Sequence, residues 1–331
     1  MPKHQEINLD FVDKKSSNSE ALSFISAGVA CYAFSLIDDL GLLDLLYVEG
    51  KLPVVHLLSY PNPLVLQTAF LTLQQSGIIT TNKKFFSLTD FGQSVFRHRA
   101  SIGYIYKGYR NLLSNQSKIV KDEPCQNDHL IDCLSVAKAS VHFGKNIIDE
   151  MILNVVRDKS IIGEICDLGC GAATRLIYLC RNTGLKGYGF DIGKNSLKKA
   201  RENIKKTDRI SVHLRDITKI DKIYPNVEVL LQAFVMHDLP DDLCQKTIFS
   251  FRSNFPNTKL LIYIDAVTSE DVMEDQLPGF EYIHSLLNIK LRTKKKTLKI
   301  FKNTGFNVIE EFEIADLPNC YMWILTPEIQ M

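Results

Sequence analysis

Apolar and polar residues alternate with the period of an α-helix in the first part of the chain. Apolar positions recur every three or four residues from Glu20 to about Leu46, which predicts a helix ending at Gly41 and a short helix after it. A periodic run over Leu64–Ser76 predicts a third helix, and the stretch Gly77–Leu88 predicts a small β-hairpin. Three helices followed by a two-stranded wing are typical of a winged-helix-like domain.

The third predicted helix argues against DNA binding. A recognition helix needs basic and amide side chains that face the groove, but this one, PLVLQTAFLTLQQ, contains no Lys or Arg. Its apolar surface suits packing against a second subunit, or against the core of its own domain. Either Thr89 or Asp90 is expected to cap the helix that follows the hairpin.

Residues 100–135 carry a mixed pattern in which residues 115–133 are expected to form a loop. Four side chains in this region could line a pocket or simply pack, and these are Tyr104, Tyr106, Tyr109 and Arg110. The stretch Val136–Val156 then predicts a helix that leads into the second half of the chain. We therefore expect two domains, residues 1–135 and 136–331.

From Ile161 onward, strand patterns alternate with helix patterns. This order predicts a doubly wound α/β domain with a seven-stranded, mostly parallel sheet whose last strand is antiparallel. The expected strands are Ile161–Leu168, Leu185–Phe190, Ile210–Leu214, Val227–Phe234, Lys259–Asp265, Phe306–Phe312 and Tyr321–Thr326. The expected helices between them include Asn195–Lys206, Asp241–Phe255 and Lys294–Thr304.

Composition places the chain among ordinary soluble proteins. It has 331 residues, 45% of them apolar and 23% charged, and a net charge of +1, which offers no general surface for nucleic acid. No apolar run is expected to reach the length of a membrane span, and the N-terminus lacks a signal-peptide core. The eight cysteines are scattered without a CxxC pair, which predicts reduced thiols and a cytoplasmic location.

A glycine turn after the first strand of the second domain predicts a cofactor site. Gly169 and Gly171 allow a sharp turn and close approach of a ligand, and Asp191 follows about 20 residues later, where it can accept two hydrogen bonds from a ribose. Thr174 occupies the third glycine position of a dinucleotide fingerprint. Asp167 would repel a pyrophosphate but can bind the amino group of a methionine moiety, so S-adenosylmethionine is favoured over NAD.

Three motifs in order resemble those of class I S-adenosylmethionine-dependent methyltransferases. They are Asp167-Leu-Gly-Cys-Gly171, Gly189-Phe-Asp-Ile192 and Arg215-Asp-Ile-Thr218, with Ala173 where many members have Gly. The resemblance implies S-adenosyl-L-methionine as cofactor and a Rossmann-like domain. It implies that the cofactor contacts Asp167, Gly169, Gly171, Asp191, Asp216, Ile217 and Phe234.

The N-terminal half is similar to small-molecule O-methyltransferases at Leu88-Thr-Asp-Phe-Gly92, which matches their "LTxxG" stretch. Members of that group dimerise through the winged domain, so the resemblance implies a homodimer and a small-molecule substrate. The stretch around His237 and Asp238 resembles their "VLHDWxDD" motif, with Leu239 in place of Trp. There the histidine is the general base, a role suited to its near-neutral pKa.

A second histidine, His284, separates this chain from the usual O-methyltransferase pattern. His237, Asp238 and His284 together resemble the metal-dependent C-methyltransferases of 2-oxo acids, which implies iron or zinc held by the two histidines. Asp238 would then hydrogen-bond a ring or a water on the metal. Arg110 and Arg292 are candidates for binding a substrate carboxylate.

Several functions remain open at this point. Metal-assisted C-methylation of a 2-oxo acid competes with O-methylation by His237 as base. A ligand-sensing DNA-binding regulator is a different class, disfavoured by the uncharged third helix. Methylation of RNA or protein is disfavoured by the neutral net charge.

Overall fold

The computed structural model describes residues 18–122, 127–144, 148–268, 279–314 and 317–328, and the chain forms two compact units, residues 1–97 and 98–331. The expected domain boundary at residue 135 falls inside the second unit. The reason is that helix α5 (Arg99–Gly103) and the following π-helical turn pack against α8 (Cys133–Gly144), while α6 (Arg110–Ser114) packs against α13 (Phe280–Leu286).

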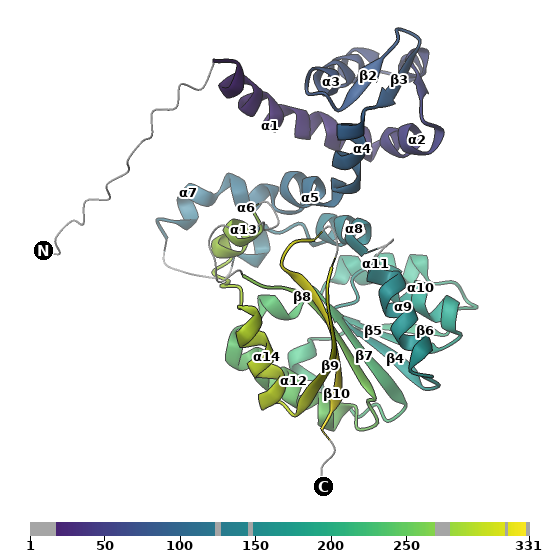
Figure 1. The fold of residues 1–331 in the computed structure, drawn as a ribbon, viewed down its shortest axis with the longest axis vertical. Helices are drawn as coiled ribbons and strands as arrows, with labels where there is room; N and C mark the ends of the chain where they lie inside the picture. Colours follow the sequence, from purple (N-terminus) through teal and green to yellow (C-terminus); the bar gives the residue numbers. More distant parts are fainter. Residues whose placement is uncertain (1–17, 123–126, 145–147, 269–278, 315–316, 329–331) are drawn as a thin grey trace, which may run out of the picture. The chain divides into compact units, whose positions relative to one another are not determined.

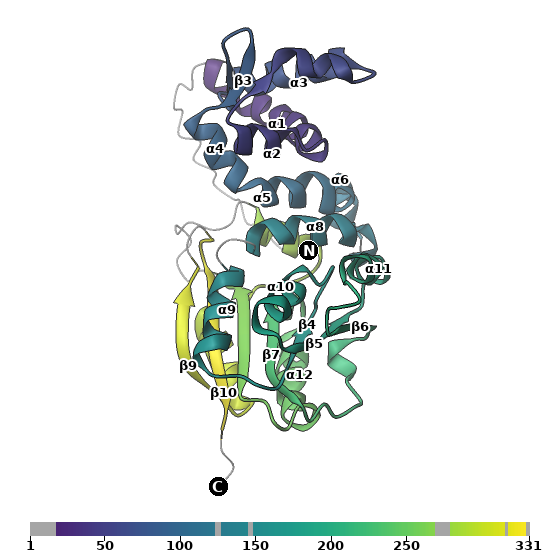
Figure 2. The ribbon, with the colours of Figure 1, turned by 90° about the vertical axis from the view of Figure 1, so that its right-hand side faces the viewer.

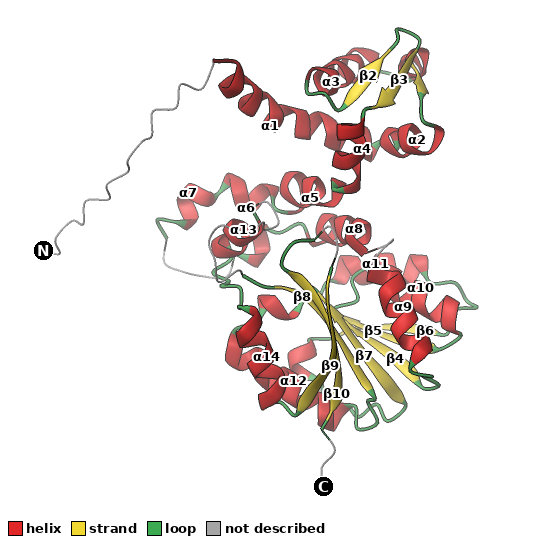
Figure 3. Ribbon diagram, in the orientation of Figure 1, coloured by secondary structure: helices red, strands yellow, loops and turns green. Residues whose placement is uncertain are grey.

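The first unit combines helices with a small antiparallel sheet (Figure 3). Its helices are α1 (Asn18–Asp39), α2 (Leu42–Glu49), α3 (Pro63–Gln75) and α4 (Asp90–Arg97), with a 3-10 segment, Val54–Ser59. Its strands are β1 (Leu52–Pro53), β2 (Ile79–Thr81) and β3 (Phe85–Leu88), in the order β1-β3-β2. The predicted helices and hairpin are thus present, and a winged-helix function for this unit stays a prediction.

Thr89, rather than Asp90, caps helix α4. Its hydroxyl oxygen accepts a hydrogen bond from the Gly92 amide at 2.9 Å and donates one to the Gly77 carbonyl at 2.6 Å. Gly92 itself must lack a side chain, since a Cβ there would lie 1.9 Å from the Ile78 carbonyl oxygen. The Leu-Thr-x-x-Gly stretch therefore has a structural role, which is to join the hairpin to α4.

Helix α1 differs from the expectation that no segment reaches the length of a membrane span. Residues Ala21–Asp39 are long and apolar enough to cross a bilayer by length and composition, and only 22% of that window is buried. Its exposed apolar side chains include Leu22, Phe24, Ile25 and Val29. A helix that pairs with another protein surface meets the same criteria, so a membrane role does not follow, and the cytoplasmic location stays a prediction.

The second unit contains the predicted seven-stranded sheet, in the order β6-β5-β4-β7-β8-β10-β9 (Figure 1). In this sheet β10 runs antiparallel to both of its neighbours, β8 and β9, whereas the strand pairs from β6 to β8 are parallel. The strands are β4 (Glu164–Leu168), β5 (Lys186–Asp191), β6 (Ile210–Leu214), β7 (Val227–Ala233), β8 (Leu260–Ala266), β9 (Phe306–Glu313) and β10 (Cys320–Pro327).

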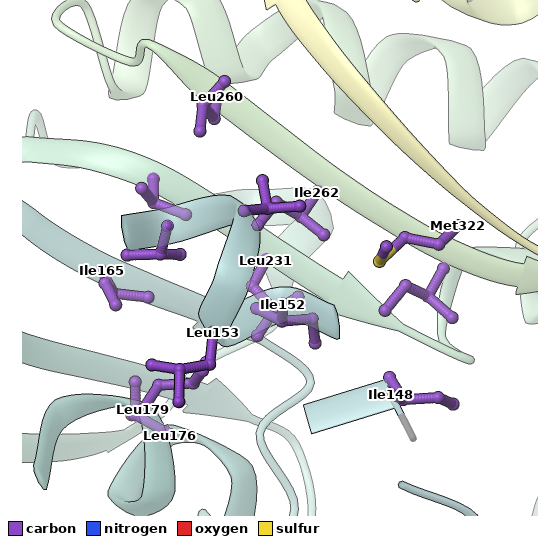
Figure 4. Packing of buried hydrophobic residues seen from close by; sticks show 14 of the residues in the cluster. Ile148, Ile152, Leu153, Ile165, Leu176, Leu179, Leu231, Leu260, Ile262 and Met322 are labelled. Carbon is purple, nitrogen blue, oxygen red and sulfur yellow. The ribbon is translucent and has the colours of Figure 1, made fainter. Parts of the chain in front are cut away.

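Helices cover both faces of this sheet (Figure 2). One face packs against α9 (Ile148–Asp158), α10 (Thr174–Thr183) and α11 (Lys194–Asn203), and the other packs against α12 (Asp241–Asn254) and α14 (Lys294–Asn303). Figure 4 shows the first of these layers, where Ile152 and Leu176 meet the strand residues Ile165 and Leu231. Because both faces are covered, the central strands β4, β7 and β8 carry buried side chains on both sides.

Two boundaries differ from the expected ones for identifiable reasons. The predicted helix Val136–Val156 is two helices, α8 and α9, and the residues between them lie outside the described part. Strand β4 begins at Glu164 and not at Ile161, because the amides of Ile162 and Gly163 donate to the Glu228 carboxylate at 3.1 and 3.0 Å. The expected loop 115–133 also contains a short helix, Gln116–Ile119.

Candidate active site

The glycine turn connects β4 to α10 through left-handed backbone. Gly169 has φ +88° and Gly171 has φ +52°, and even Ala173, which precedes the helix, has φ +56°. A Cβ on Gly169 would lie 2.3 Å from a methyl group of Val235, so the turn also requires glycine for space. The amides of Gly169 and Cys170 donate to the carbonyl of Phe190, at 2.8 and 3.0 Å, which ties the turn to β5.

Asp191, at the end of β5, holds the turn from the other side. Its carboxylate accepts hydrogen bonds from the Gly171 amide at 2.8 Å and the Gly193 amide at 2.6 Å. Burial nevertheless raises the pKa of Asp191 above its ordinary value. The residue lies beside the turn as predicted, and two of its acceptor positions already serve the backbone.

Asp167 is the buried acid of this crevice. Burial raises its pKa to about 7, Arg175 counteracts the rise, and the nearby Asp191 and Asp149 add to it. Arg175 is itself engaged, since its Nε donates to Asp149 at 2.7 Å. A carboxylate in this situation is stabilised by a cationic ligand, which is what the amino group of a methionine moiety would supply.

The other expected cofactor residues lie at the same edge of the sheet. Asp216 follows β6, and its carboxylate accepts hydrogen bonds from the Thr218 amide at 2.9 Å and the Thr218 hydroxyl at 2.7 Å. Buried Ile217 is next in the chain. Phe234 follows β7 with φ +58°, a strained conformation for a bulky residue. The carboxyl ends of four adjacent strands thus form the crevice where parallel sheets bind nucleotides.

His237 and Asp238 follow β7 in a 3-10 turn, Met236–Asp238. His237 is 6% exposed, and its Nδ1 donates to the carboxylate of Asp265 at the end of β8. Burial alone would lower the pKa of His237, but the carboxylates of Asp265 and Asp238 outweigh it and raise the pKa to about 9. The second Asp265 oxygen is buried without a hydrogen-bond partner.

His284 approaches the same point from α13. It is 2% exposed, and its Nδ1 donates to the Phe280 carbonyl at 2.7 Å, which leaves Nε2 as the acceptor. Burial, together with the charge of His237, lowers the pKa of His284 to about 3. The Asp238 Oδ1 lies 3.3 Å from Nε2 of His237 and 3.9 Å from Nε2 of His284, and the two rings are 5.0 Å apart.

Comparison with known proteins agrees with this arrangement. A family model described as "Methyltransferase domain" matches residues 163–305. The chain is 32% identical over 319 residues to an indolepyruvate C-methyltransferase of Streptomyces griseus. The matched residues make up 93% of this chain and 95% of the relative. The chain belongs to the S-adenosylmethionine-dependent methyltransferases. This membership identifies the chain as an enzyme, and the expectation that it binds no DNA stays a prediction.

Solved structures share the fold of this methyltransferase at low sequence identity. Human N-acetylserotonin methyltransferase, solved in complex with S-adenosylmethionine, has a TM-score of 0.70 at 17% identity and covers 96% of this chain and 99% of its own. A mitomycin 7-O-methyltransferase has a TM-score of 0.63 at 14% identity and covers 93% and 97%. Both the helical unit and the Rossmann-like unit therefore have counterparts in the family.

The expectation that Arg292 binds a substrate carboxylate was wrong. Arg292 is buried, and its Nε donates to Asp241 at 2.8 Å while the two Nη atoms donate to the carbonyls of Met236 and Leu239. All three guanidinium nitrogens thus donate hydrogen bonds to other residues of the protein. Arg292 holds the turn that carries His237 and Asp238.

Arg110 is exposed on the first residue of α6, and none of the ion pairs described for this unit includes it. The adjacent Tyr109 lies closer to the histidines, with its ring 6.4 Å from that of His284. Burial and the Asp238 carboxylate raise the pKa of Tyr109 above its ordinary value, so its hydroxyl stays protonated. The role of Arg110 toward substrate stays a prediction.

Asp265 was missed by the sequence reasoning although a signal was present. It is the one acidic residue of β8, Leu260–Ala266, in which every residue is buried. An acid at the carboxyl end of such a strand must have a partner, because an isolated buried charge is costly. The histidine on the neighbouring strand end is that partner.

The residues fit a metal. His237, Asp238 and His284 each offer one donor atom, and these atoms lie within 4.8 Å of one another. Both imidazoles present Nε2 toward the common point because Nδ1 is engaged by Asp265 in one case and by a carbonyl in the other. Such outer partners are typical of metal-binding histidines. Two histidines and one carboxylate form a donor set that suits iron and also zinc.

Proposed function

We propose that this methyltransferase transfers the methyl group of S-adenosylmethionine to the carbon next to the ketone of a 2-oxo acid, with a metal at the histidine pair. The observation that carries this proposal is the cluster of His237, Asp238 and His284 at the edge of the cofactor crevice. The Streptomyces relative, named for C-methylation of indolepyruvate, supports the same reaction class.

His237 and His284 would hold the metal through Nε2, and one oxygen of Asp238 is within reach of the same point. The metal, when bound, acts as a Lewis acid that stabilises the negative charge on the ketone oxygen. Asp265 keeps the proton of His237 on Nδ1, and the Phe280 carbonyl does the same for His284. Arg292 holds the turn that carries His237 through its hydrogen bond to the Met236 carbonyl.

In the reaction, the carbon next to the ketone first loses a proton to the Asp238 carboxylate, which is 52% exposed and can pass it to solvent. The resulting enolate carbon attacks the methyl carbon of the sulfonium in line. A carbon–carbon bond forms as the bond from sulfur to methyl breaks. The ketone is restored and S-adenosylhomocysteine leaves as a neutral thioether.

O-methylation is the second candidate. The Asp265–His237 pair favours it, because a carboxylate that orients an imidazole is the arrangement a general base requires. Solved neighbours include O-methyltransferases. In this case a hydroxyl proton would pass to Nε2 of His237 in its neutral form, which is populated above a pKa of about 9, and no metal would be needed.

Metal analysis and product structure separate the two candidates. We expect purified protein to hold about one iron or zinc per chain, to lose it in His284→Ala, and to convert phenylpyruvate to its C-methylated product by NMR. The Tyr282→Phe variant, altered on the exposed side of the same helix, should keep metal and activity. Metal-free wild-type protein that methylates a hydroxyl would overturn the proposal.

We also propose that the enzyme is a homodimer formed through its first unit. Apolar side chains exposed on α1 and α3, including Phe24, Ile25, Val29, Leu64 and Leu71, support this proposal. The two helices pack against each other, so their exposed residues belong to one helical layer. A second copy of the same chain offers a matching apolar surface.

A further inference from the structure

The segment that carries Tyr109 has an unusual backbone. Residues Tyr104–Gly108 form a π-helical turn, in which the Tyr109 amide donates to the Tyr104 carbonyl at 2.7 Å. Such turns are rare and are frequent at functional sites, because they change the direction of the side chains that follow. The turn therefore points to a functional role for the residue that follows it, Tyr109.

A hydrogen bond, a close glycine contact and a stacked ring hold this turn and Tyr109 in place. The Asp132 amide donates to the Gly108 carbonyl at 2.9 Å, and a Cβ on Gly108 would lie only 2.7 Å from a methyl group of Val136. Tyr104 stacks on Tyr109, with ring centroids 6.0 Å apart and planes 28° apart. The position of Tyr109 is thus determined by backbone, by a tight glycine contact and by a neighbouring ring.

This position brings Tyr109 to the histidine cluster. Its ring packs beside His284, and it borders the apolar group of Leu112, Ile283 and Leu286. After burial, the charge that most affects its hydroxyl is the Asp238 carboxylate. His237 and His284 are almost fully buried while Asp238 is half-exposed, so the cluster is open on the side of Asp238. Tyr109 packs beside His284, whose Nε2 lies 3.9 Å from the Asp238 carboxylate.

We propose that Tyr109 is a substrate-binding residue, whose hydroxyl donates a hydrogen bond to an anionic oxygen of the 2-oxo acid at the His237–Asp238–His284 cluster. The inference rests on the proposed function for the substrate class. A phenol suits this task because it donates without a charge, and so it can sit near a carboxylate and still bind an anionic oxygen. The hydrogen bond orients the acceptor carbon at the cluster.

The test removes only the hydroxyl. Tyr109→Phe keeps the ring, its packing and its stacking, whereas Tyr282→Phe removes a phenol from an exposed position on α13 and serves as the matched control. Full-length, metal-loaded protein is assayed with phenylpyruvate. Oxalate, a dianion with two adjacent carboxylates that imitates an enolised 2-oxo acid, is titrated by calorimetry in parallel.

Loss of a hydrogen bond to a charged oxygen should lower kcat/KM for phenylpyruvate and weaken oxalate binding by roughly 10- to 100-fold in Tyr109→Phe. The metal content, the affinity for S-adenosylmethionine and Tm should stay at wild-type values, which a merely structural role would not allow. Tyr282→Phe should stay within about twofold of wild type throughout.

The outcomes separate the two claims. If the wild type methylates phenylpyruvate and Tyr109→Phe matches it within twofold in both assays, the role of Tyr109 is overturned while the proposed function stands. If the wild type methylates no 2-oxo acid and does not bind oxalate, the proposed function fails and the role of Tyr109 fails with it.

Discussion

Asp265 shows how one buried side chain determines the behaviour of another. Burial would keep His237 neutral, yet the contact with Asp265 raises the pKa of that histidine to about 9. The same contact holds Nδ1, so Nε2 faces the site, and the ring must lose its Nε2 proton before that atom can bind a metal or accept a hydroxyl proton. The chemistry of the site therefore depends on a residue that does not itself reach the substrate.

Asp265→Asn should test this dependence. The Asn amide carries no negative charge, so it orients the His237 ring more weakly and makes Nε2 a poorer metal ligand. We therefore expect metal affinity to fall about 10- to 100-fold, and kcat to fall with it. Metal titration of the purified variant measures the effect. Asp242→Asn, in an exposed ion pair on α12, is the control and should bind metal normally.

Asp167 should make cofactor binding depend on pH. Its pKa of about 7 lies above the value in an unfolded chain, so the ionised form destabilises the ligand-free fold as pH rises through 7. The ammonium group of S-adenosylmethionine favours that ionised form. The rise in Tm on adding cofactor should therefore be larger at pH 8 than at pH 6, and Asp167→Asn should bind weakly at both. Equal shifts in the wild type at the two pH values would contradict this role.

At the scale of elements, much of the site lies on turns that follow strands, and two of these turns are held by side chains from other segments: Asp191 holds the glycine turn and Arg292 the turn with His237. Helices and strands were largely predictable because their apolar periodicity is local. For example, the limits of β6 were predicted without error at Ile210–Leu214. The start of β4 was not, because it depends on the Glu228 carboxylate from another strand.

Arg292→Met should weaken the turn that carries His237. The change removes donors from Asp241 and from the buried carbonyl of Met236, so we expect unfolding in urea to show a loss of about 2–3 kcal/mol and metal binding to weaken. Lys199→Met, which breaks an exposed pair with Glu202, is the comparison and should cost much less. Equal losses in the two variants would show that Arg292 does not hold the turn.

Gly169→Ala should abolish cofactor binding at the glycine turn. The substitution faces both φ +88° and the methyl of Val235 at 2.3 Å, whereas Gly184→Ala meets a positive φ but open space. We expect Gly184→Ala to lose about 1 kcal/mol of stability and to bind S-adenosylmethionine normally by calorimetry. Adding Val235→Ala to Gly169→Ala should restore part of the stability, since it removes the clash and leaves the backbone strain.

At the scale of the whole molecule, the first unit has an apolar helix, α1, whose first half its own core does not cover, while Phe34 and Ile37 in its second half are buried. Phe24→Asp combined with Ile25→Asp should convert the proposed dimer to monomers in light scattering, because charges would be buried at the contact. The same changes on the polar positions Ser23 and Ser26 should leave the dimer intact. A wild-type protein that is monomeric at all concentrations would contradict the proposed dimer.

The amino-acid sequence by itself determined the sheet, the glycine turn and the carboxylates of the cofactor crevice, because these follow from short-range periodicity and closely spaced motifs. Only the tertiary structure decided how distant residues meet. It brought Asp265 to His237 and His284 to Asp238. It also directed Arg292 to the backbone of the turn at Met236 and placed Tyr109 beside His284. Each of these contacts joins residues at least 28 positions apart in the chain. Burial shifts the pKa values of these side chains only once the chain has folded around them.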